Sequence, residues 1–545
     1  MYVVSVEQMR MIEKKANELG VPYEQMMEYA GTGMAEFINT RFSMEFEDEE
    51  NKSILGLIGS GNNGGDALIT LRELQTKGWI THAYIVLERT TSDPLISTYQ
   101  ACGGTVHNHS ADPKFAALKK ICPSVQFVLD GILGIGAHLP LDETIKSVLK
   151  TVSKFEEGMV NLAVDCPTGI DCVSGEVAPE TLHFDFTLSM AAVKTGLLTF
   201  PAFEYCGNFV NISIGVEKIL PTFESELCEI ITPAKISTLL PLRPLDSHKG
   251  TFGTVMVVAG SINYTGAVML AAEAAYRSGA GLVRAAIPGM IHTAIAGHIP
   301  EATWLLLPHA AGVIAESAAE LIHKSLGKTT ALLVGPGIET EETTRHFLKR
   351  LLARPGKKGS LGVIGFVPTD SKEPEINGIP VLPPLVVDAD ALRILADIPE
   401  WWKLLPAGSI LTPHPGEMAA LSGISVQEIQ EKRMELALHF AKEWKQIVIL
   451  KGALTVIASP DGKVYLSTFA NPSLARAGSG DILAGLITGF LAQGVKPLDA
   501  AQLGVWIHGS CGELASEDSD AATILARDLI NQIPVCVRVL RELTY

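Results

Sequence analysis

The chain has 545 residues, of which 43 are Lys or Arg and 60 are Asp or Glu, so its formal net charge is −17. This length predicts roughly three or four domains of ordinary size, or two large ones. The acidic balance argues against a protein that binds a nucleic-acid backbone through a basic face. Hydrophobic residues make up 47% and charged residues 19%, which argues against a globally disordered chain.

The cysteines and the start of the chain indicate a cytoplasmic protein. The eight cysteines are scattered and form no CxxC pair, so we expect reduced, packed thiols and no disulfide framework. Ser5 and Gln8 form a capping box for an amphipathic helix that Gly20 ends. Charged residues interrupt that segment, which excludes a signal peptide. No run of about 20 apolar residues is present, so we expect no membrane span and no membrane partner.

Two blocks of alternating strand and helix pattern follow one another. In the first block we expect strands at 53–58, 83–87, 127–130, 162–165 and 184–190. In the second block we expect strands at 254–259, 282–287, 331–334, 385–387, 447–450 and 455–458. Helix-length spacers between apolar strands predict parallel βαβ units. The expected fold class is therefore α/β, as two tandem three-layer α/β sandwiches.

The boundary between the two blocks lies where the pattern loosens and prolines accumulate, between Glu217 and Pro244. We place the two domains at residues 1–225 and 226–545. The acidic run 45–50 is expected to be a solvated loop. The stretch 354–380 is rich in Gly, Pro and Lys and is expected to be a surface insertion.

A glycine-rich segment, Gly61–Asp66, follows the first core strand, and a helical pattern begins at Ala67. Glycines let a backbone approach a ligand closely, and the N–H groups at a helix start bind anions. The segment matches neither GxGxxG nor GxxxxGK[ST], and a structural turn with an Asx cap is the alternative. Asp130 and Asp165 end two further strands, and Lys194 is a fourth candidate, although a lone lysine is usually solvated. Because ligands bind beyond the carboxyl ends of parallel strands, we expect one crevice here.

The second block carries a comparable loop, Gly478–Asp481, at the start of a helix. Its backbone N–H groups form a cradle suited to phosphate. A carboxylate at Asp481 would accept a proton from a substrate hydroxyl beside a transferring phosphoryl group. The structural alternative is a glycine-rich turn with a capping aspartate.

The segments Asn62–Asp66 (NNGGD) and Val164–Asp171 (VDCPTGID) resemble the Rossmann-like epimerase domain of the bifunctional NAD(P)H-hydrate repair enzymes. Ala67 stands where that family usually has glycine. The resemblance implies a potassium ion held by Asn63, Asp130 and Thr168, and places Asp165 at the reacting centre. It implies that the hydrated nucleotide is bound by Asn62, Asn63, Gly64, Gly65, Asp66, Gly134, Ile135, Gly136, Ala137, His138, Leu139, Pro140 and Asp165.

Hydrated nicotinamide carries a hydroxyl at C6, next to a ring nitrogen with a lone pair. Protonation of that hydroxyl lets the nitrogen expel water, and water that returns from the other face inverts C6. One carboxyl group that gives and takes a proton suffices, so we expect Asp165 to be the general acid and base.

The second block resembles the ribokinase-like superfamily, and in particular the ADP-dependent NAD(P)H-hydrate dehydratases. The TPHPGE form of Thr412–Glu417 carries this distinction, because sugar and vitamin kinases usually have Asn-x-x-Glu in place of His414–Glu417. The resemblance implies that Asp481 is the catalytic base and that Ala274, Gly337, His414 and Asp481 contact the hydrated nucleotide. It implies that ADP is bound by Lys451, Gly452, Ala453, Leu454, Thr455, Asn471, Pro472, Ser473, Leu474, Ala475, Arg476, Ala477, Gly478, Ser479 and Gly480.

One of these ADP-binding positions and the residue before Asn471 depart from the family pattern. Arg476 stands where small residues are frequent, and Ala470, just before Asn471, stands where glycine is frequent.

The implied dehydration uses phosphate as a leaving group. Asp481 deprotonates the C6 hydroxyl, the β-phosphoryl group of ADP transfers to it, and phosphate leaves with loss of the C5 proton, giving AMP and phosphate. Mg²⁺ would neutralise the phosphates, with Glu417 as an outer partner. The expected partners are NADHX, NADPHX and ADP, with no nucleic acid, and a homo-oligomer is expected.

Two other functions remain open. One is a ribokinase-type small-molecule kinase fused to a non-catalytic nucleotide-binding module, against which His414 argues. The other is a binding or scaffold protein, against which the combination of Asn63, Asp130, Asp165 and Lys194 argues.

Overall fold

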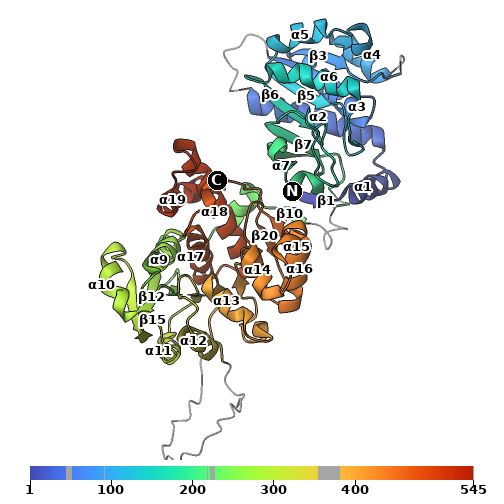
Figure 1. Cartoon of the computed structure of the whole chain (residues 1–545). Coiled ribbons are helices and arrows are strands. Elements are labelled where there is room, and N and C mark those ends of the chain that lie inside the picture. The colour runs from blue at the N-terminus through green and yellow to red at the C-terminus, as the bar shows by residue number, and fades with distance from the viewer. Residues whose placement is uncertain (44–51, 91–92, 218, 221–227, 354–380, 544–545) are drawn as a thin grey trace, which may run out of the picture. The chain divides into compact units, whose positions relative to one another are not determined.

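The computed structural model describes residues 1–43, 52–90, 93–217, 219–220, 228–353 and 381–543. The chain forms two compact units, unit 1 (Met1–Glu229) and unit 2 (Ile230–Tyr545), whose elements are labelled in Figure 1. The acidic run 45–50 and the stretch 354–380 lie outside the described residues.

Unit 1 is built on a seven-stranded sheet in the order β4-β3-β2-β5-β6-β7-β9, with parallel pairing throughout. The strands are β2 (Ser53–Ile58), β3 (Ile80–Ile85), β4 (Thr105–Asn108), β5 (Phe127–Gly131), β6 (Val160–Val164), β7 (Phe186–Met190) and β9 (Asn208–Ile212). The chain runs outward from β2 to β4 and then returns to β5 on the other side of β2. The strand order therefore reverses between β2 and β5, where open α/β sheets bind their ligands.

Helices cover both faces of this sheet. One hydrophobic core joins it to α1, α2 and α3, and a second core joins its other face to α5 and α6. The helices are α1 (Val6–Glu18), α2 (Tyr23–Phe42), α3 (Asn62–Thr76), α4 (Pro94–Ala101), α5 (Ala116–Ile121), α6 (Glu143–Val152) and α7 (Phe203–Cys206). Three short strands lie apart from the sheet, and β1 (Tyr2–Val4) pairs with both β8 (Ala192–Lys194) and β10 (Cys228–Ile230).

The two helix starts predicted in unit 1 have different outcomes. Ser5 and Gln8 form the expected capping box of α1. The predicted helix start at Ala67 is wrong, because α3 begins at Asn62. The glycines of the segment pack inside the first turn of the helix: a Cβ atom on Gly64 would lie 2.1 Å from the carbonyl oxygen of Gly59. The glycine-rich segment is therefore the helix start itself.

Unit 2 contains strands in the order β13-β12-β11-β16-β17-β18-β19-β20-β21, parallel from β13 to β19 and antiparallel beyond it. They are β11 (Thr254–Val258), β12 (Leu282–Pro288), β13 (Thr303–Leu307), β16 (Ala331–Val334), β17 (Leu385–Val387), β18 (Ile410–Leu411), β19 (Ile447–Leu450), β20 (Val456–Ala458) and β21 (Val464–Leu466). A separate antiparallel pair consists of β14 (His309–Ala310) and β15 (Val313–Ile314).

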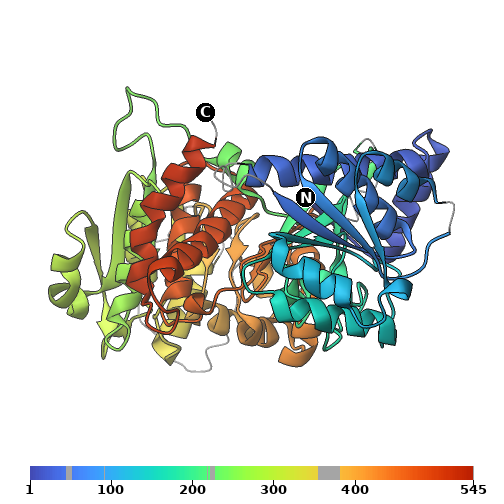
Figure 2. The same cartoon turned by 90° about the horizontal axis from the view of Figure 1, so that it is seen from above.

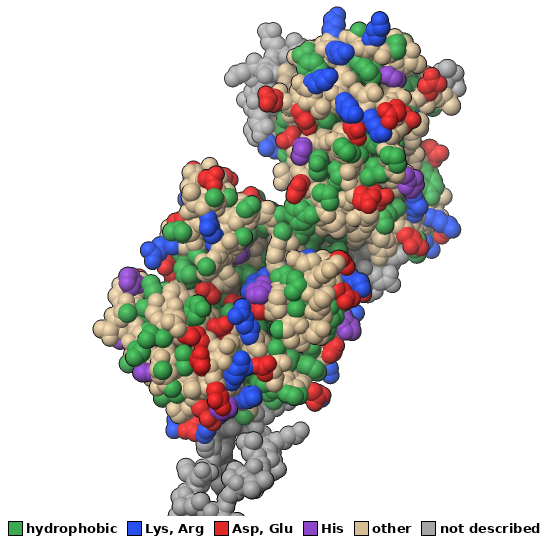
Figure 3. Space-filling view, viewed as in Figure 1, with side chains coloured by type: hydrophobic (Ala, Val, Ile, Leu, Met, Phe, Trp, Pro, Cys, Tyr) green, Lys and Arg blue, Asp and Glu red, His purple; other side chains and the backbone are tan. Residues whose placement is uncertain are grey.

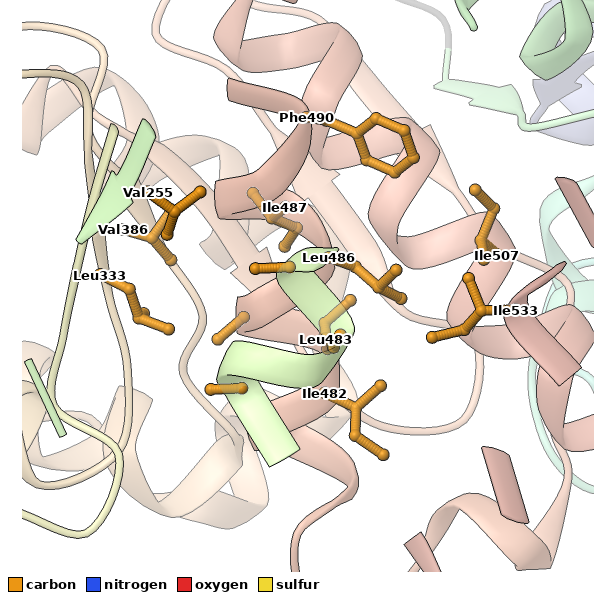
Figure 4. Close-up of a cluster of buried hydrophobic side chains, with 14 of the residues drawn as sticks. Val255, Leu333, Val386, Ile482, Leu483, Leu486, Ile487, Phe490, Ile507 and Ile533 are labelled. Carbon is orange, nitrogen blue, oxygen red and sulfur yellow. The ribbon is translucent and has the colours of Figure 1, made fainter. Parts of the chain in front are cut away.

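One face of this sheet is covered by α9, α17, α18 and α19, which share a hydrophobic core with it. Figure 4 shows part of that core, in which Val255, Leu333 and Val386 from the sheet face Ile487 and its neighbours on α17. The residues that alternate with these on the strands are buried too, so both faces are covered. Figure 2 shows α17, α18 and α19 side by side in red.

The helices of unit 2 are α8 (Pro233–Leu239), α9 (Thr265–Arg277), α10 (His292–Ile295), α11 (Ala318–Ser325), α12 (Glu342–Leu352), α13 (Asp390–Ala396), α14 (Pro415–Ser422), α15 (Val426–Glu431), α16 (Arg433–Trp444), α17 (Ser479–Ala492), α18 (Pro497–Asp518) and α19 (Ala526–Glu542). The expected α/β class, with parallel sheets between helices, is confirmed in both units. All eight cysteines are free. Among the described residues, no helix is both long enough and apolar enough to cross a membrane.

Candidate active sites

In unit 1, the start of α3 faces the end of β5. No side chain caps this start, because its N-cap is Gly61, so backbone N–H groups there are available to an anion. Arg89 lies beside the start and donates to the carbonyl oxygens of Gly59 (2.8 Å) and Gly61 (3.0 Å). Asp93 holds the same guanidinium at 2.7 Å. Sequence reasoning missed Arg89, which follows β3 without any recognisable motif.

The three residues predicted to hold potassium come together beyond β5 and β6. Thr168 donates to Asp130 through both its backbone N–H and its hydroxyl, each at 2.8 Å. The Asn63 amide donates to the carbonyl oxygens of Leu133 (3.0 Å) and Val164 (2.6 Å). Asp130 is fully buried, and its burial raises its pKa to about 6 although the hydrogen bonds from Thr168 oppose this. A buried carboxylate with these neutral partners is suited to a cation.

The predicted catalytic residue, Asp165, directly follows β6 and has a positive φ of 62°. Its Oδ1 atom accepts hydrogen bonds from the backbone N–H of Met190 (2.9 Å) and from the ammonium of Lys194. Lys194 is fully buried and also donates to the carbonyl oxygen of Ala192 at 3.1 Å. Lys194, a candidate in the sequence, is therefore not solvated as lone lysines usually are, but lies buried against Asp165. Burial lowers the pKa of Lys194, but the charge of Asp165, together with Cys166 and Cys172, outweighs it, so the net pKa is raised.

Two further carboxyl groups share the electrostatic field of this pair. Burial raises the pKa of Asp66 well above its ordinary value, and the charges of Asp165 and Glu13 raise it further. Burial also raises the pKa of Glu13, which Lys194 opposes. Glu13 lies on α1 and was missed by sequence reasoning, because a glutamate on an amphipathic helix carries no signal of its own.

Residues 134–140 form the turn beyond β5, where the backbone N–H of Ala137 donates to Gly134 (2.9 Å). Apart from buried Ala137, these residues are half-buried or exposed. Gly134 lies against Asn63, since a Cβ atom on it would be 2.5 Å from Asn63 Oδ1. The structure thus places the predicted substrate-binding turn next to the predicted potassium ligands.

In unit 2, a network of charges lies beyond β17, β18 and β19. The ammonium of Lys451 is 2.8 Å from Asp388 and 3.8 Å from Glu417. The hydroxyl of Thr412 donates to the same Asp388 oxygen at 2.7 Å. Asp388 and Glu417 are buried. Lys451 was predicted as an ADP ligand, whereas the role of Asp388 in holding it, and that of Thr412 in holding Asp388, were not.

Asp481 lies in the first turn of α17, next to this network. Its burial raises its pKa to about 7, with a further increase from Asp388 that Lys451 opposes. A Cβ atom on Gly480 would lie 3.4 Å from Lys451 Nζ, so the helix start and the network are adjacent. A carboxyl group with such a pKa can accept a proton near neutral pH.

His414 is the N-cap of α14. Its Nδ1 atom accepts from the backbone N–H groups of Gly416 (3.0 Å) and Glu417 (3.2 Å), and Glu417 accepts from the His414 N–H at 2.8 Å. Burial lowers the pKa of His414, with Lys451 contributing to the decrease and Glu417 opposing it. The imidazole therefore caps α14, and Glu417, which the His414 backbone N–H holds, lies 3.8 Å from the ammonium of Lys451.

The other residues predicted to bind ligands in unit 2 differ in how exposed their surroundings are. Gly337 has a positive φ of 63° and lies against Tyr264, whose side chain is exposed. Ala274 lies in the hydrophobic core on α9 and is fully buried, so the structure does not bring it to the site surface. The segment Lys451–Thr455 is held by Arg433, which donates to the carbonyl oxygens of Leu450 (3.0 Å) and Lys451 (3.2 Å).

The segment Asn471–Gly480 leads into α17. Its first residue, Asn471, is the N-cap of a short 3-10 helix, Pro472–Leu474. The side chain of Asn471 accepts a hydrogen bond from the backbone N–H of Ser473 at 2.9 Å. The guanidinium of Arg476 donates to the carbonyl oxygen of Ala522, so this departure from the family pattern has a local structural partner. Over the described residues that Figure 3 shows, acidic and basic side chains are interspersed.

Each unit matches a known family model. The family model described as NAD(P)H-hydrate dehydratase matches residues 255–356 and 379–535, and the model described as YjeF-related protein N-terminus matches residues 23–196. The chain is 30% identical to an ADP/ATP-dependent NAD(P)H-hydrate dehydratase of Bacillus subtilis crystallised with ATP and Mg²⁺, with 57% of this chain and 99% of that chain covered and a TM-score of 0.46.

Two relatives match over nearly their whole length. A bifunctional NAD(P)H-hydrate repair enzyme of Moorella thermoacetica is 33% identical over 99% of this chain and 98% of its own. That of Dictyoglomus turgidum is 30% identical over 98% of both chains. The chain therefore belongs to the family of bifunctional NAD(P)H-hydrate repair enzymes.

Proposed function

We propose that unit 1 epimerises the R and S hydrates of NADH and NADPH at C6, and that unit 2 dehydrates the S hydrate with ADP. The observation that supports this proposal is that each unit has its own cluster of charged side chains at the carboxyl ends of its parallel strands. In unit 1 it is the buried pair of Asp165 and Lys194. In unit 2 it is Asp481 beside the network of Lys451 and Asp388. We assign the two activities to residues 1–225 and 226–545.

In unit 1, Asp165 is proposed to give a proton to the C6 hydroxyl and to take one from the returning water. Lys194 and the backbone N–H of Met190 both bind Oδ1, which fixes the carboxyl group. Asp66 keeps its proton more readily than an ordinary aspartate because its pKa is raised.

The oxygen atoms near Asp130 fit a potassium ion. The set contains a buried carboxylate, the hydroxyl of Thr168 and the amide oxygen of Asn63, and hard cations prefer oxygen ligands. These three residues would hold the ion. Once bound, it would supply positive charge close to the anionic substrate.

In unit 2, Asp481 is proposed to take the proton of the C6 hydroxyl. The hydroxyl oxygen of the substrate then attacks the β-phosphorus of ADP. Lys451 lies close enough to the start of α17 to neutralise phosphate charge there. Mg²⁺ would be held mainly by the phosphates, since the described residues include no cluster of three or more His, Cys, Asp or Glu side chains arranged for a metal. Phosphate then leaves C6 while C5 loses its proton.

This proposal also includes the predicted substrate residues of unit 1 and the predicted ADP residues, 451–455 and 471–480. Its partners are NADHX, NADPHX and ADP, and a homo-oligomer in the cytoplasm is part of it. The relatives' names support the substrates, and the free cysteines support the compartment.

A product assay tests the proposed dehydration chemistry. The purified chain is incubated with the S hydrate, ADP and Mg²⁺, and nucleotides and phosphate are quantified by chromatography. The proposal predicts one AMP and one phosphate for each NADH restored. NADH that is restored while ADP stays intact would contradict it, and ADP formed from ATP with vitamin alcohols would favour the kinase alternative.

A further inference from the structure

One face of α18 supports the segment that leads into α17. His508, Gly512 and Ser516 are spaced four residues apart and therefore lie on the same side of this helix. The carbonyl oxygen of Gly512 accepts from Asn471 (3.4 Å) and Ser473 (3.3 Å), and the hydroxyl of Ser516 donates to Asn471 (3.2 Å). The proposed ADP segment thus rests on α18 through the backbone carbonyl of Gly512 and the hydroxyl of Ser516, which no sequence motif singles out.

His508 makes the contact closest to the proposed chemistry. Its Nε2 atom lies 2.8 Å from the hydroxyl oxygen of Ser479. Ser479 is buried and is the first residue of α17, directly after Gly478, which has a positive φ of 91°. The next two residues are Gly480 and Asp481. The hydrogen bond therefore holds the turn whose backbone N–H groups and carboxyl group face the ligand in the proposed function.

The imidazole of His508 is neutral at physiological pH. Burial lowers its pKa to about 4, with Lys451 contributing to the decrease and a hydrogen bond with the backbone of Ser479 opposing it. A neutral imidazole has one donor nitrogen and one acceptor nitrogen. It can hold a hydroxyl in a fixed orientation without adding charge or exchanging protons in the neutral range.

We propose that His508 is a positioning residue of the dehydratase, which acts through Ser479 to fix the first turn of α17 and with it Asp481. The inference rests on the proposed function of unit 2. The turn needs such support because Gly478, the residue before it, has backbone freedom that other residues lack. A small shift of the carboxyl group and the N–H groups would misalign base, hydroxyl and phosphate.

Four variants of the full chain test this role: H508L, which removes the hydrogen bond, H508Q, whose amide reaches a position similar to that of Nε2, S479A, and the double variant H508L/S479A. For each, kcat and KM for ADP are measured with the S hydrate. We expect H508L and S479A each to lower kcat by about 10- to 100-fold, and H508Q to stay within about threefold. The double variant is expected to be no worse than either single variant.

The epimerase of unit 1 and the pH profile are the controls. Epimerisation should be unchanged in all four variants, and the thermal midpoint should lie above the assay temperature. The dehydratase pH profile of H508Q should match that of the parent chain, because His508 does not titrate there.

Several outcomes would overturn the inference: parent-like kcat in H508L or S479A, independent losses that multiply in the double variant, or a limb of the pH profile that vanishes in H508Q. If H508L fails to fold, S479A and H508Q test the same hydrogen bond. A parent chain without dehydratase activity would instead refute the proposed function, whereas an active parent with unaffected variants refutes only the role of His508.

Discussion

The ammonium of Lys194 donates to Oδ1 of Asp165, and both side chains are buried in unit 1. The carboxyl group directly follows β6, and the lysine lies at the end of β8. A buried ion pair is costly to leave half-complete, because the remaining charge loses its partner in a medium of low dielectric constant. The pair therefore couples the stability of unit 1 to its proposed chemistry.

Replacement of Lys194 by methionine should destabilise unit 1 and abolish epimerisation. The expected loss in the free energy of unfolding is about 3–5 kcal/mol, because Asp165 would be left buried and unpaired. Thermal unfolding of the chain measures it. The double variant K194M/D165N should recover much of the stability but not the activity, and a K194M chain as stable as its parent would contradict the account.

Asp165→Asn should separate the two activities. The amide keeps the size of the side chain but cannot exchange the proton, so epimerisation should fall by about 10²–10⁴-fold. Dehydration of the pure S hydrate should be unchanged, since Asp481 lies in the other unit. Rates of interconversion of the two hydrates, followed by chromatography, give the answer. Epimerisation at the parent rate would rule out Asp165 as the acid and base.

The pH dependence of the dehydratase should reflect Asp481. Its pKa is raised to about 7, and the base must be unprotonated to accept the hydroxyl proton. We therefore expect kcat/KM for the S hydrate to rise with pH, to reach half of its maximum near pH 7 and to level off above it. D481N should lack this activity at every pH. A flat profile between pH 5 and 8 would argue against Asp481 as the base.

The same pKa makes a prediction about stability. A carboxyl group whose pKa is raised by folding stabilises the fold most at low pH, and this contribution is lost as pH rises from about 4 to about 7. D481N removes the cost of the buried charge. At pH 8 the variant should be more stable than the parent by about 1–2 kcal/mol, allowing for the partial exposure of the group. Near pH 4 the two chains should unfold at the same temperature.

Two glycines at the start of α3 should differ in their tolerance of alanine. A Cβ atom on Gly64 would lie 2.1 Å from the carbonyl oxygen of Gly59, whereas a Cβ atom on Gly61 meets nothing within 4 Å. We expect G64A to lower epimerase activity at least about tenfold by displacing the helix start, and G61A to keep it within about threefold. Initial rates at saturating hydrate, with dehydratase activity as the folding control, distinguish the two.

The parts of the sites that follow from local pattern could be predicted from the sequence. Asp130, Asp165 and Asp481 each stand at the end of a strand or the start of a helix, Asp130 and Asp481 directly beside a glycine, and parallel sheets gather such positions at one edge. The capping box of Ser5 and Gln8 is equally local. Short-range rules therefore suffice for the α/β class and for most of the core strands.

The parts that depend on packing between distant segments could not be predicted in this way. Glu13 and Arg89 reach the first site from elements that carry no motif, and Asp388 holds Lys451 across 63 positions of sequence. The predicted start of α3 is too late because paired glycines normally indicate a loop. Here Gly65 lies inside α3 and packs against Met27 of α2. Lys194, at the end of β8, is buried because it pairs with Asp165, which follows β6.

The most direct test of the whole account uses the two separated hydrates of NADH. Each is given to the parent chain and to D165N, with and without ADP, and the absorbance of restored NADH is followed. The account predicts that the S hydrate is restored by both chains only with ADP. It predicts that the R hydrate is restored by the parent alone, again only with ADP. Restoration of the R hydrate by D165N at the parent rate, or of either hydrate without a nucleotide, would contradict it.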